Sequence, residues 1–190
     1  MQKGFMGSLP MIFVAAVFMI IANPPVTADM IASGGFWSIF SGWYNFAQAN
    51  KMTILIPYNM TMGLLGMACA FMIAYNLAKT YTMSMVASGF TAMITFLVVA
   101  APGSYVGLAD GTFPLMMPMG YLGAQGLFSA IIIALITVEI TRFCQKHNIT
   151  IKLPDSMPPT MTESFATIIP MLLNVSLFFI LNLLIQSSGI

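Results

Sequence analysis

Residues 122–185 decide the fold of this chain. They read LGAQGLFSAIIIALITVEI from Leu122 to Ile140, TRFCQKHNITIKLPDSMPP from Thr141 to Pro159, TMTE, and SFATIIPMLLNVSLFFILNLLI from Ser164 to Ile185. About 20 apolar residues, at a rise near 1.5 Å each, cross a hydrocarbon core of roughly 30 Å, so both apolar runs predict transmembrane helices. The connector between them carries three of the six basic residues of the chain, and we expect it to lie outside the bilayer.

The composition is that of a membrane protein. Hydrophobic residues make up 59% of the chain, charged residues only 6%, and the mean hydropathy is +0.93. A soluble domain has about 25% charged residues, so this chain could not cover a water-facing surface. Its net charge of +1 provides no basic field, which disfavours nucleic acid as a partner. Cys69 and Cys144 lack a CxxC spacing, so we expect free thiols rather than a disulfide or a zinc site.

The apolar segments predict an all-α fold in a single membrane domain over residues 1–190. Spanning helices are expected near residues 4–22, 52–77, 84–101, 121–143 and 161–185. The length of the first, and the Pro24-Pro25 pair after it, favour a retained helix over a cleaved signal peptide. The fold class is therefore a polytopic transmembrane helical bundle with about five spanning helices plus one amphipathic helix.

That amphipathic helix is expected near residues 35–50. Its apolar face recurs at three- and four-residue spacing at Phe36, Phe40, Trp43 and Ala47. Its polar face carries Ser38, Ser41, Asn45 and Gln48. Both tryptophans of the chain lie here, which suits the lipid headgroup boundary. However, the helix has no Lys or Arg before Lys51, so packing against the protein's own helices remains an equal alternative.

Small residues form a stripe on each of two predicted spans. The stripes are Gly66, Ala70 and Ala74 on the second span, and Gly126, Ala130 and Ala134 on the fourth. A four-residue spacing of small side chains lets a neighbouring helix approach closely. Chance is the alternative, since Gly and Ala are abundant in this chain.

Basic residues predict the orientation in the membrane. With a cytoplasmic N-terminus and five spans, the cytoplasmic side holds Lys3, Lys79, Arg142, Lys146 and Lys152. Only Lys51 then lies outside, and such an excess of Lys and Arg marks the cytoplasmic side.

Few residues are candidates for chemistry. Glu139 is the acidic residue within an apolar segment, but Arg142 follows at i+3, so we expect an interfacial ion pair rather than a proton or sugar ligand. His147 and Cys144 have no partner in sequence that would activate them. Thr160 and Glu163 form a capping box before the last span. The other polar candidates within the spans are Asn59, Gln125, Asn174 and Asn182.

Three segments carry a resemblance to a known family. They are Gly123–Phe128 (GAQGLF), Ala130–Ile140 (AIIIALITVEI) and His147–Pro170 (HNITIKLPDSMPPTMTESFATIIP). They resemble the membrane-embedded IIC component of phosphotransferase-system (PTS) sugar transporters of the lactose/cellobiose group. The connector is the most specific part, with I-K-L-P, then Pro-Pro, then Ser-Phe and a closing Ile-Pro. Leu9–Pro25 (LPMIFVAAVFMIIANPP) also resembles the first helix of that family.

The resemblance implies a PTS permease subunit in the bacterial cytoplasmic membrane. Such a subunit carries a disaccharide or similar β-glucoside while a phosphocysteine on IIB phosphorylates the sugar, within a protein-Npi-phosphohistidine–sugar phosphotransferase complex. The implied partners are the IIB and IIA components, membrane lipid and a second copy in a homodimer. In the family the first five helices mainly build the dimer, whereas the sugar-contacting His and Glu belong to a second half with no matching positions here.

Two interpretations of this 190-residue chain remain open: a fragment or split half of a transporter, and an independent membrane scaffold that keeps only the dimerisation bundle. In both cases we expect no catalytic residue, no cofactor and no metal site in the chain, and we assign no substrate-binding residue. The thin polar inventory predicts that the chain alone does not bind sugar.

Overall fold

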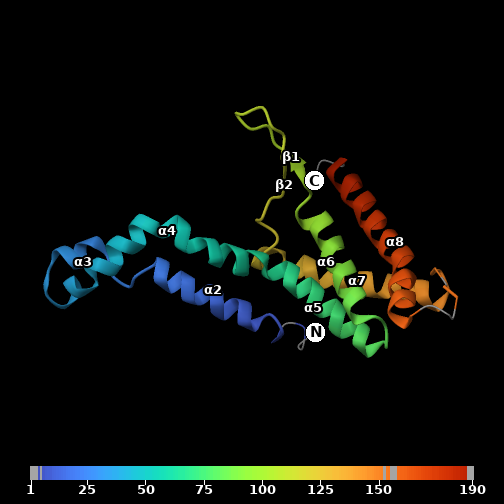
Figure 1. Ribbon diagram of the computed structural model, residues 1–190. Helices are drawn as coiled ribbons and strands as arrows, with labels where there is room; N and C mark the ends of the chain where they lie inside the picture. Colours follow the sequence, from blue (N-terminus) through green and yellow to red (C-terminus); the bar gives the residue numbers. More distant parts are fainter. Residues whose placement is uncertain (1–3, 5, 152, 155–157, 188–190) are drawn as a thin grey trace. The chain divides into compact units, whose positions relative to one another are not determined.

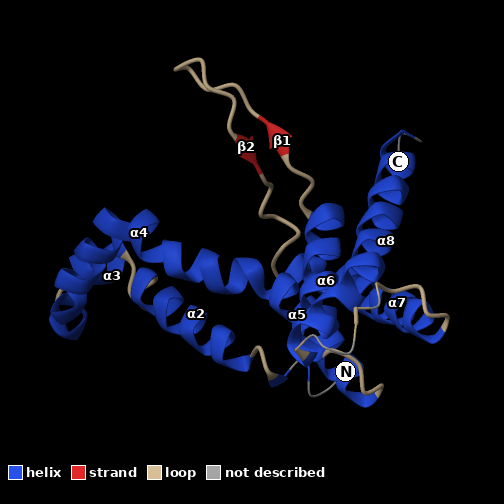
Figure 2. Ribbon diagram, turned by 45° about the vertical axis from the view of Figure 1, so that its right-hand side comes forward, coloured by secondary structure: helices blue, strands red, loops and turns tan. Residues whose placement is uncertain are grey.

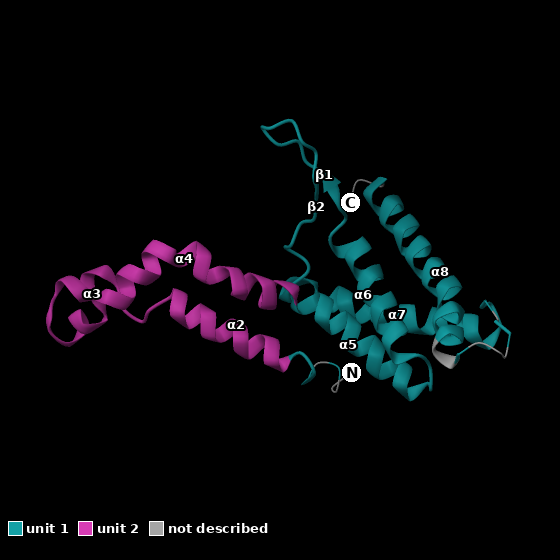
Figure 3. Ribbon diagram, viewed as in Figure 1, with its two compact units in different colours: residues 1–8, 65–190 teal, residues 9–64 magenta. Residues whose placement is uncertain are grey.

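The computed structural model describes residues 4, 6–151, 153–154 and 158–187. These residues are helical except for connecting loops and one short hairpin (Figure 2), so the predicted all-α helical bundle is confirmed. By internal contacts the chain divides into two compact units, residues 9–64 and residues 1–8 together with 65–190 (Figure 3). The single membrane domain over 1–190 stays a prediction.

The unit of residues 9–64 is built on two helices that pack against each other, α2 and α4. Its elements are α2 (Leu9–Ala22), α3 (Ala28–Ala32), η1 (Gly35–Phe40), α4 (Ser41–Thr61) and η2 (Met62–Leu64). Ala15, Ala22 and Ala47 are fully buried, as expected where two helix backbones approach closely. The indole Nε1–H of Trp43 donates a 2.9 Å hydrogen bond to the carbonyl of Ile21, which ties α4 to the end of α2.

The structure differs from the expected boundary between the amphipathic helix and the second span. After the 3-10 turn η1, helix α4 runs without interruption from Ser41 to Thr61, because nothing in Asn50-Lys51-Met52 disfavours helix. The α-helical geometry gives way only at η2, which contains Gly63. Trp43 and Ala47 face the protein's own helix, as the packing alternative requires, whereas Phe36 and Phe46 remain exposed.

The second unit is a four-helix bundle whose middle is formed by α6 and α7. Its helices are α5 (Leu65–Thr80), α6 (Met85–Ala100), η3 (Ala124–Gly126), α7 (Leu127–Lys146) and α8 (Pro159–Ser187). Helix α5 packs on α6 and α7, and α8 packs on the same two helices (Figure 1). The expected spans near 84–101, 121–143 and 161–185 correspond to α6, α7 and α8. Between α6 and α7, β1 (Ser104–Tyr105) and β2 (Leu115–Met116) pair antiparallel in a projecting hairpin.

Both small-residue stripes are buried inside this unit. All six residues of the stripes are shielded from solvent, on α5, η3 and α7. A Cβ added to Gly66 would lie 2.8 Å from the carbonyl oxygens of Leu122 and Gly123, and one added to Gly126 would overlap the carbonyl of Tyr121. The stripes are therefore buried in the packing of this unit, and their two glycines are places of close backbone approach.

Three of the described helical runs are long and apolar enough to cross a membrane. They are Gly35–Thr80, Ala124–Lys146 and Met161–Ser187. Helices α2 and α6 are apolar but shorter, with 14 and 16 residues. Lys3, Lys152 and the side chain of Thr160 lie outside the described residues, so the capping box and part of the basic count stay predictions.

Candidate functional site

The candidate site lies where the C-terminal ends of α5 and α7 come together. Helix α5 is closed by two backbone bonds, in which the N–H of Thr82 donates to Lys79 O at 3.3 Å and the N–H of Met83 donates to Ala78 O at 3.0 Å. Thr82 has a φ of 54°, the left-handed conformation that follows the last residue of a helix in this type of cap. The cap turns the chain sharply and places Tyr81 at the helix end.

Helix α7 ends with the same backbone cap. The N–H of Asn148 donates to Gln145 O at 3.2 Å and the N–H of Ile149 donates to Cys144 O at 2.8 Å, while Asn148 has a φ of 58°. Asn tolerates this conformation better than most residues, which is one reason why the helix stops here. The last two turns of α7 thus carry Glu139, Arg142 and Lys146 to the end of the bundle.

Tyr81, Glu139 and Arg142 form one polar cluster across the two helices. The Tyr81 hydroxyl donates a 2.7 Å hydrogen bond to Glu139 Oε1, and Arg142 Nη1 lies 3.5 Å from Glu139 Oε2. The Arg142 guanidinium also sits over the Tyr81 ring, with its Cζ 4.1 Å from the ring centroid. The hydrogen bond to Glu139, followed by desolvation, raises the pKa of Tyr81 above its usual value, because ionisation would place a phenolate against the carboxylate.

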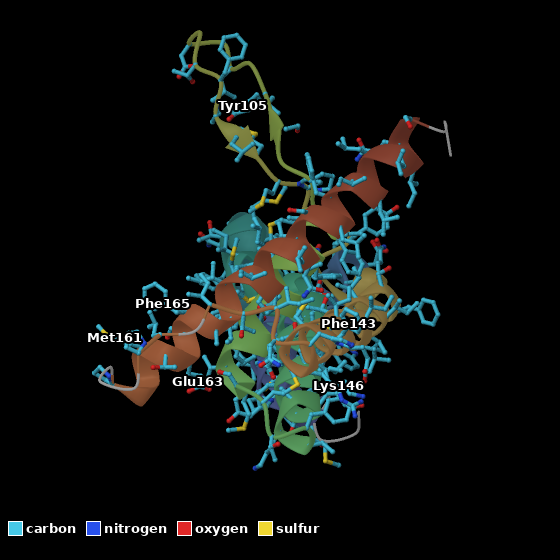
Figure 4. All side chains as sticks on the ribbon, turned by 90° about the vertical axis from the view of Figure 1, so that its right-hand side faces the viewer. Tyr105, Phe143, Lys146, Met161, Glu163 and Phe165 are labelled. Atoms are coloured by element: carbon cyan, nitrogen blue, oxygen red, sulfur yellow. The ribbon has the colours of Figure 1, made fainter. Side chains whose placement is uncertain are left out.

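Two hollows adjoin this cluster on the outer face of α7. One of about 240 Å³ is lined by Glu139, Arg142, Phe143 and Lys146. The other, of about 410 Å³, runs along the helix and is lined by Leu135, Ile136, Glu139, Ile140 and Phe143. Figure 4 shows Phe143 and Lys146 together on this part of α7. An apolar groove therefore leads to a pair of cationic side chains.

The expected ion pair of Glu139 and Arg142 is confirmed, but the sequence did not predict its third member. Tyr81 is 58 positions away from Glu139, and only the packing of α5 on α7 brings them together. A tyrosine directly after an apolar helix is a weak signal, since aromatic residues are frequent at membrane interfaces.

The contacts of His147 and of the two cysteines are those of packing rather than of a reactive site. The His147 Nδ1 lies 2.9 Å from Phe143 O, and the centroids of the two rings lie 4.1 Å apart with the rings tilted by 36°, at the end of α7. Cys69 and Cys144 are buried free thiols. No three His, Cys, Asp or Glu residues gather into a potential metal site within the described part of the chain.

The remaining polar candidates serve packing or face outward, and they do not share a pocket. Asn174 is fully buried and its amide nitrogen donates to Thr141 Oγ1 at 3.2 Å and to Pro170 O at 2.8 Å. The Asn182 amide donates to Val98 O at 3.1 Å, which ties α8 to α6. Asn59 and Gln125 are exposed. Two fully buried atoms, Thr137 Oγ1 and Asn174 Oδ1, have no hydrogen-bond partner in the structure.

Comparisons with known proteins agree on one family. The family model described as phosphotransferase system, EIIC, matches residues 2–189. The lichenan permease IIC component of Bacillus subtilis (strain 168) is 28% identical over 99% of this chain and 40% of its own length. The PTS system lactose-specific EIICB component of Streptococcus mutans serotype c is 27% identical over 98% of this chain and 30% of its own length.

A solved structure has the same fold. The crystal structure of the transporter ChbC, the IIC component from the N,N'-diacetylchitobiose-specific phosphotransferase system, matches with a TM-score of 0.77 and 28% identity. The match covers 97% of this chain and 42% of that one. The chain therefore spans about two fifths or less of the length of these proteins.

Proposed function

The chain belongs to the EIIC family of the phosphotransferase system, and from this membership we propose that it supplies the N-terminal membrane bundle of a sugar permease of the cellobiose/lactose type. The observation that carries the proposal is the match with ChbC, which covers nearly all of this chain but only 42% of that transporter. The substrate class is a β-linked disaccharide or a similar glucoside. The location is the bacterial cytoplasmic membrane, with the N-terminus in the cytoplasm.

The bundle is not competent to bind sugar by itself. A disaccharide loses water from many hydroxyls when it enters a pocket, and each hydroxyl left unpaired costs roughly 1–3 kcal/mol. Among the described residues, the buried amide of Asn174 and the half-buried amide of Asn182 already hold helices together, and Glu139 is engaged by Tyr81 and Arg142. The groove along α7 is lined mainly by aliphatic and aromatic side chains. The polar side chains that do share a hollow, Ser84, Glu163, Ser164 and Thr167 from α6 and α8, are fewer than the hydroxyls of a disaccharide.

The partners follow from the family. PTS EIIC components work with IIB and IIA, and the name of the Streptococcus mutans relative shows that IIC and IIB can share one polypeptide. We propose the same IIB and IIA partners for the present chain, and a IIB phosphocysteine would phosphorylate the sugar. A homodimer is part of the same proposal, and the large exposed apolar side chains of α8, such as Leu172, Phe179 and Leu184, are consistent with further helices or a second copy covering it.

Calorimetry tests the proposal directly. The purified 190-residue chain is titrated with cellobiose and with lactose, and a full-length EIIC relative of known sugar serves as the positive control. We expect no heat of binding from the chain alone, and binding after coexpression with the C-terminal segment of such a relative. Saturable millimolar or tighter binding by the chain alone would contradict the proposal. Stable dimers with no gain of sugar binding upon coexpression would instead favour a membrane scaffold.

A further inference from the structure

The outer face of α7 carries an apolar groove with no described side chain covering it. Its lining comes from Leu135, Ile136, Ile140 and Phe143, together with Glu139, over about two turns of one helix, in a hollow of about 410 Å³. The groove lies on a segment long and apolar enough to cross a membrane, so its depth corresponds to that of the hydrocarbon core. Phe143 is 56% exposed, which leaves a large aromatic surface at the polar end of the groove.

Two basic side chains lie at the polar end of the groove. Arg142 and Lys146 are separated by four positions and therefore lie on the same side of α7, one turn apart, around the smaller hollow of about 240 Å³. The Glu139 carboxylate beside them is occupied by Arg142 and by the Tyr81 hydroxyl. No described carboxylate forms an ion pair with Lys146, so the local balance is positive.

We propose that this face of α7 binds an anionic phospholipid, with the headgroup phosphate on Arg142 and Lys146 and an acyl chain along the groove of Leu135, Ile136, Ile140 and Phe143. Guanidinium and ammonium groups are the phosphate-binding side chains of proteins, and Arg142 uses only Nη1 toward a described acceptor. The order of the parts matches that of a lipid, because the two basic side chains lie at the end of the span and Leu135 and Ile136 lie toward its middle, while the Glu139 carboxylate between them is paired with Arg142 and Tyr81. Charge complementarity thus selects an acidic lipid over a zwitterionic one.

Native mass spectrometry of the protein purified from membranes in a mild detergent tests this inference. The probes are dioleoyl phosphatidylglycerol, dioleoyl phosphatidylcholine and inorganic phosphate, which has the anion without the chains. A basic residue near an anionic surface is worth about a fivefold change in binding, so we expect phosphatidylglycerol to bind several-fold tighter than phosphatidylcholine. Lys146→Gln should lower that preference about fivefold, and millimolar phosphate should not displace the lipid.

Matched variants separate the site from a general surface effect. Lys79→Gln removes an exposed lysine from the last turn of α5 and should leave the lipid preference unchanged. Ile136→Ser should weaken both lipids, whereas Ile132→Ser, at an equally exposed position outside the groove lining, should not. Equal binding of the two lipids, an unchanged preference in Lys146→Gln, displacement by phosphate, or the same loss in Lys79→Gln would each overturn the proposal.

Discussion

At the scale of single residues, Tyr81 connects the two helix ends through opposite parts of one side chain. Its hydroxyl stabilises the carboxylate of Glu139, and its ring face carries the guanidinium of Arg142. The carboxylate and the guanidinium therefore both contact the same uncharged side chain. Replacing Tyr81 by Phe keeps the ring under Arg142 and removes only the hydrogen bond.

The raised pKa of Tyr81 gives a pH-dependent prediction. Because the folded-state pKa lies above the unfolded value near 10, this contribution to stability is complete below about pH 10 and is lost as the pH rises through the folded pKa. Absorbance titration of the tyrosinate should show a late-titrating tyrosine that is absent in Tyr81→Phe. In Glu139→Gln the late component should move to lower pH. A titration curve identical in all three proteins would refute the hydrogen bond to Glu139 as the cause of the raised pKa.

The two helix caps differ in how well their residues suit the left-handed conformation. Thr82 is β-branched and strained at φ 54°, whereas Asn148 at φ 58° is tolerated. We expect Thr82→Asn to raise the free energy of unfolding by up to about 1 kcal/mol, and Asn148→Thr to lower it by about the same amount. Thermal unfolding in detergent measures both, and a shift of the same sign in the two variants would contradict the explanation.

Local spacing explains which parts of the cluster the sequence could predict. Glu139 and Arg142 are three positions apart on one helix, so their contact needs no knowledge of the fold. The position of Tyr81 depends on how α5 and α7 pack, and the same holds for the partners of Asn174 and Asn182, which come from α7 and α6. Contacts between distant segments are set by packing, which a single sequence does not reveal.

At the scale of elements, two glycines permit close backbone contacts, Gly66 between α5 and the segment before η3, and Gly126 within the turn that leads into α7. A methyl group at Gly126 would overlap the carbonyl of Tyr121, and one at Gly66 would press on two further carbonyls. We expect Gly126→Ala to lower the free energy of unfolding by about 1–3 kcal/mol, because backbone atoms must move to make room for the methyl group. A detergent-based unfolding assay or the yield of monodisperse protein reports the loss.

Gly42 is the matched control for this substitution. Nothing lies within 4 Å of a Cβ built on it, in helix α4. Gly42→Ala should therefore be neutral or stabilising by up to about 1 kcal/mol, since Ala favours helix. Equal destabilisation by Gly126→Ala and Gly42→Ala would show that the contact with Tyr121 is not the cause of the loss of stability.

The ends of the helices could be predicted where helix-breaking prolines mark them. Pro24-Pro25 follows α2, and the connector with its prolines precedes α8. The continuity of α4 across the expected boundary near Lys51 was not predicted, because a change of polarity along a helix changes what it packs against without interrupting its hydrogen bonds. The paired strands at Ser104–Tyr105 and Leu115–Met116 lie in a turn-rich stretch whose two-residue strands have no periodicity to detect.

At the scale of the whole molecule, the basic residues predict one orientation. The ends of α5 and α7 lie together in the bundle, so Lys79 and Lys146 belong to the same side. We expect a cysteine introduced at Lys146 to react with a membrane-impermeant maleimide only from the cytoplasm, and one at Lys51 only from outside. The native cysteines are buried and should react slowly. Equal labelling of the Lys146 position from the outside would overturn the orientation.

The buried amide of Asn174 has a consequence for how the chain assembles. It meets Thr141 across the contact of α7 and α8, and in hydrocarbon it would find no water as a substitute. A slip of α8 by one turn, about 5.4 Å, would break the bond between α7 and α8 and leave each partner only the bond within its own helix, from Asn174 to Pro170 and from Thr141 to Thr137. Together with the bond from Asn182 to Val98, this contact favours one register for the last helix, because a purely apolar helix would accept neighbouring registers almost equally well.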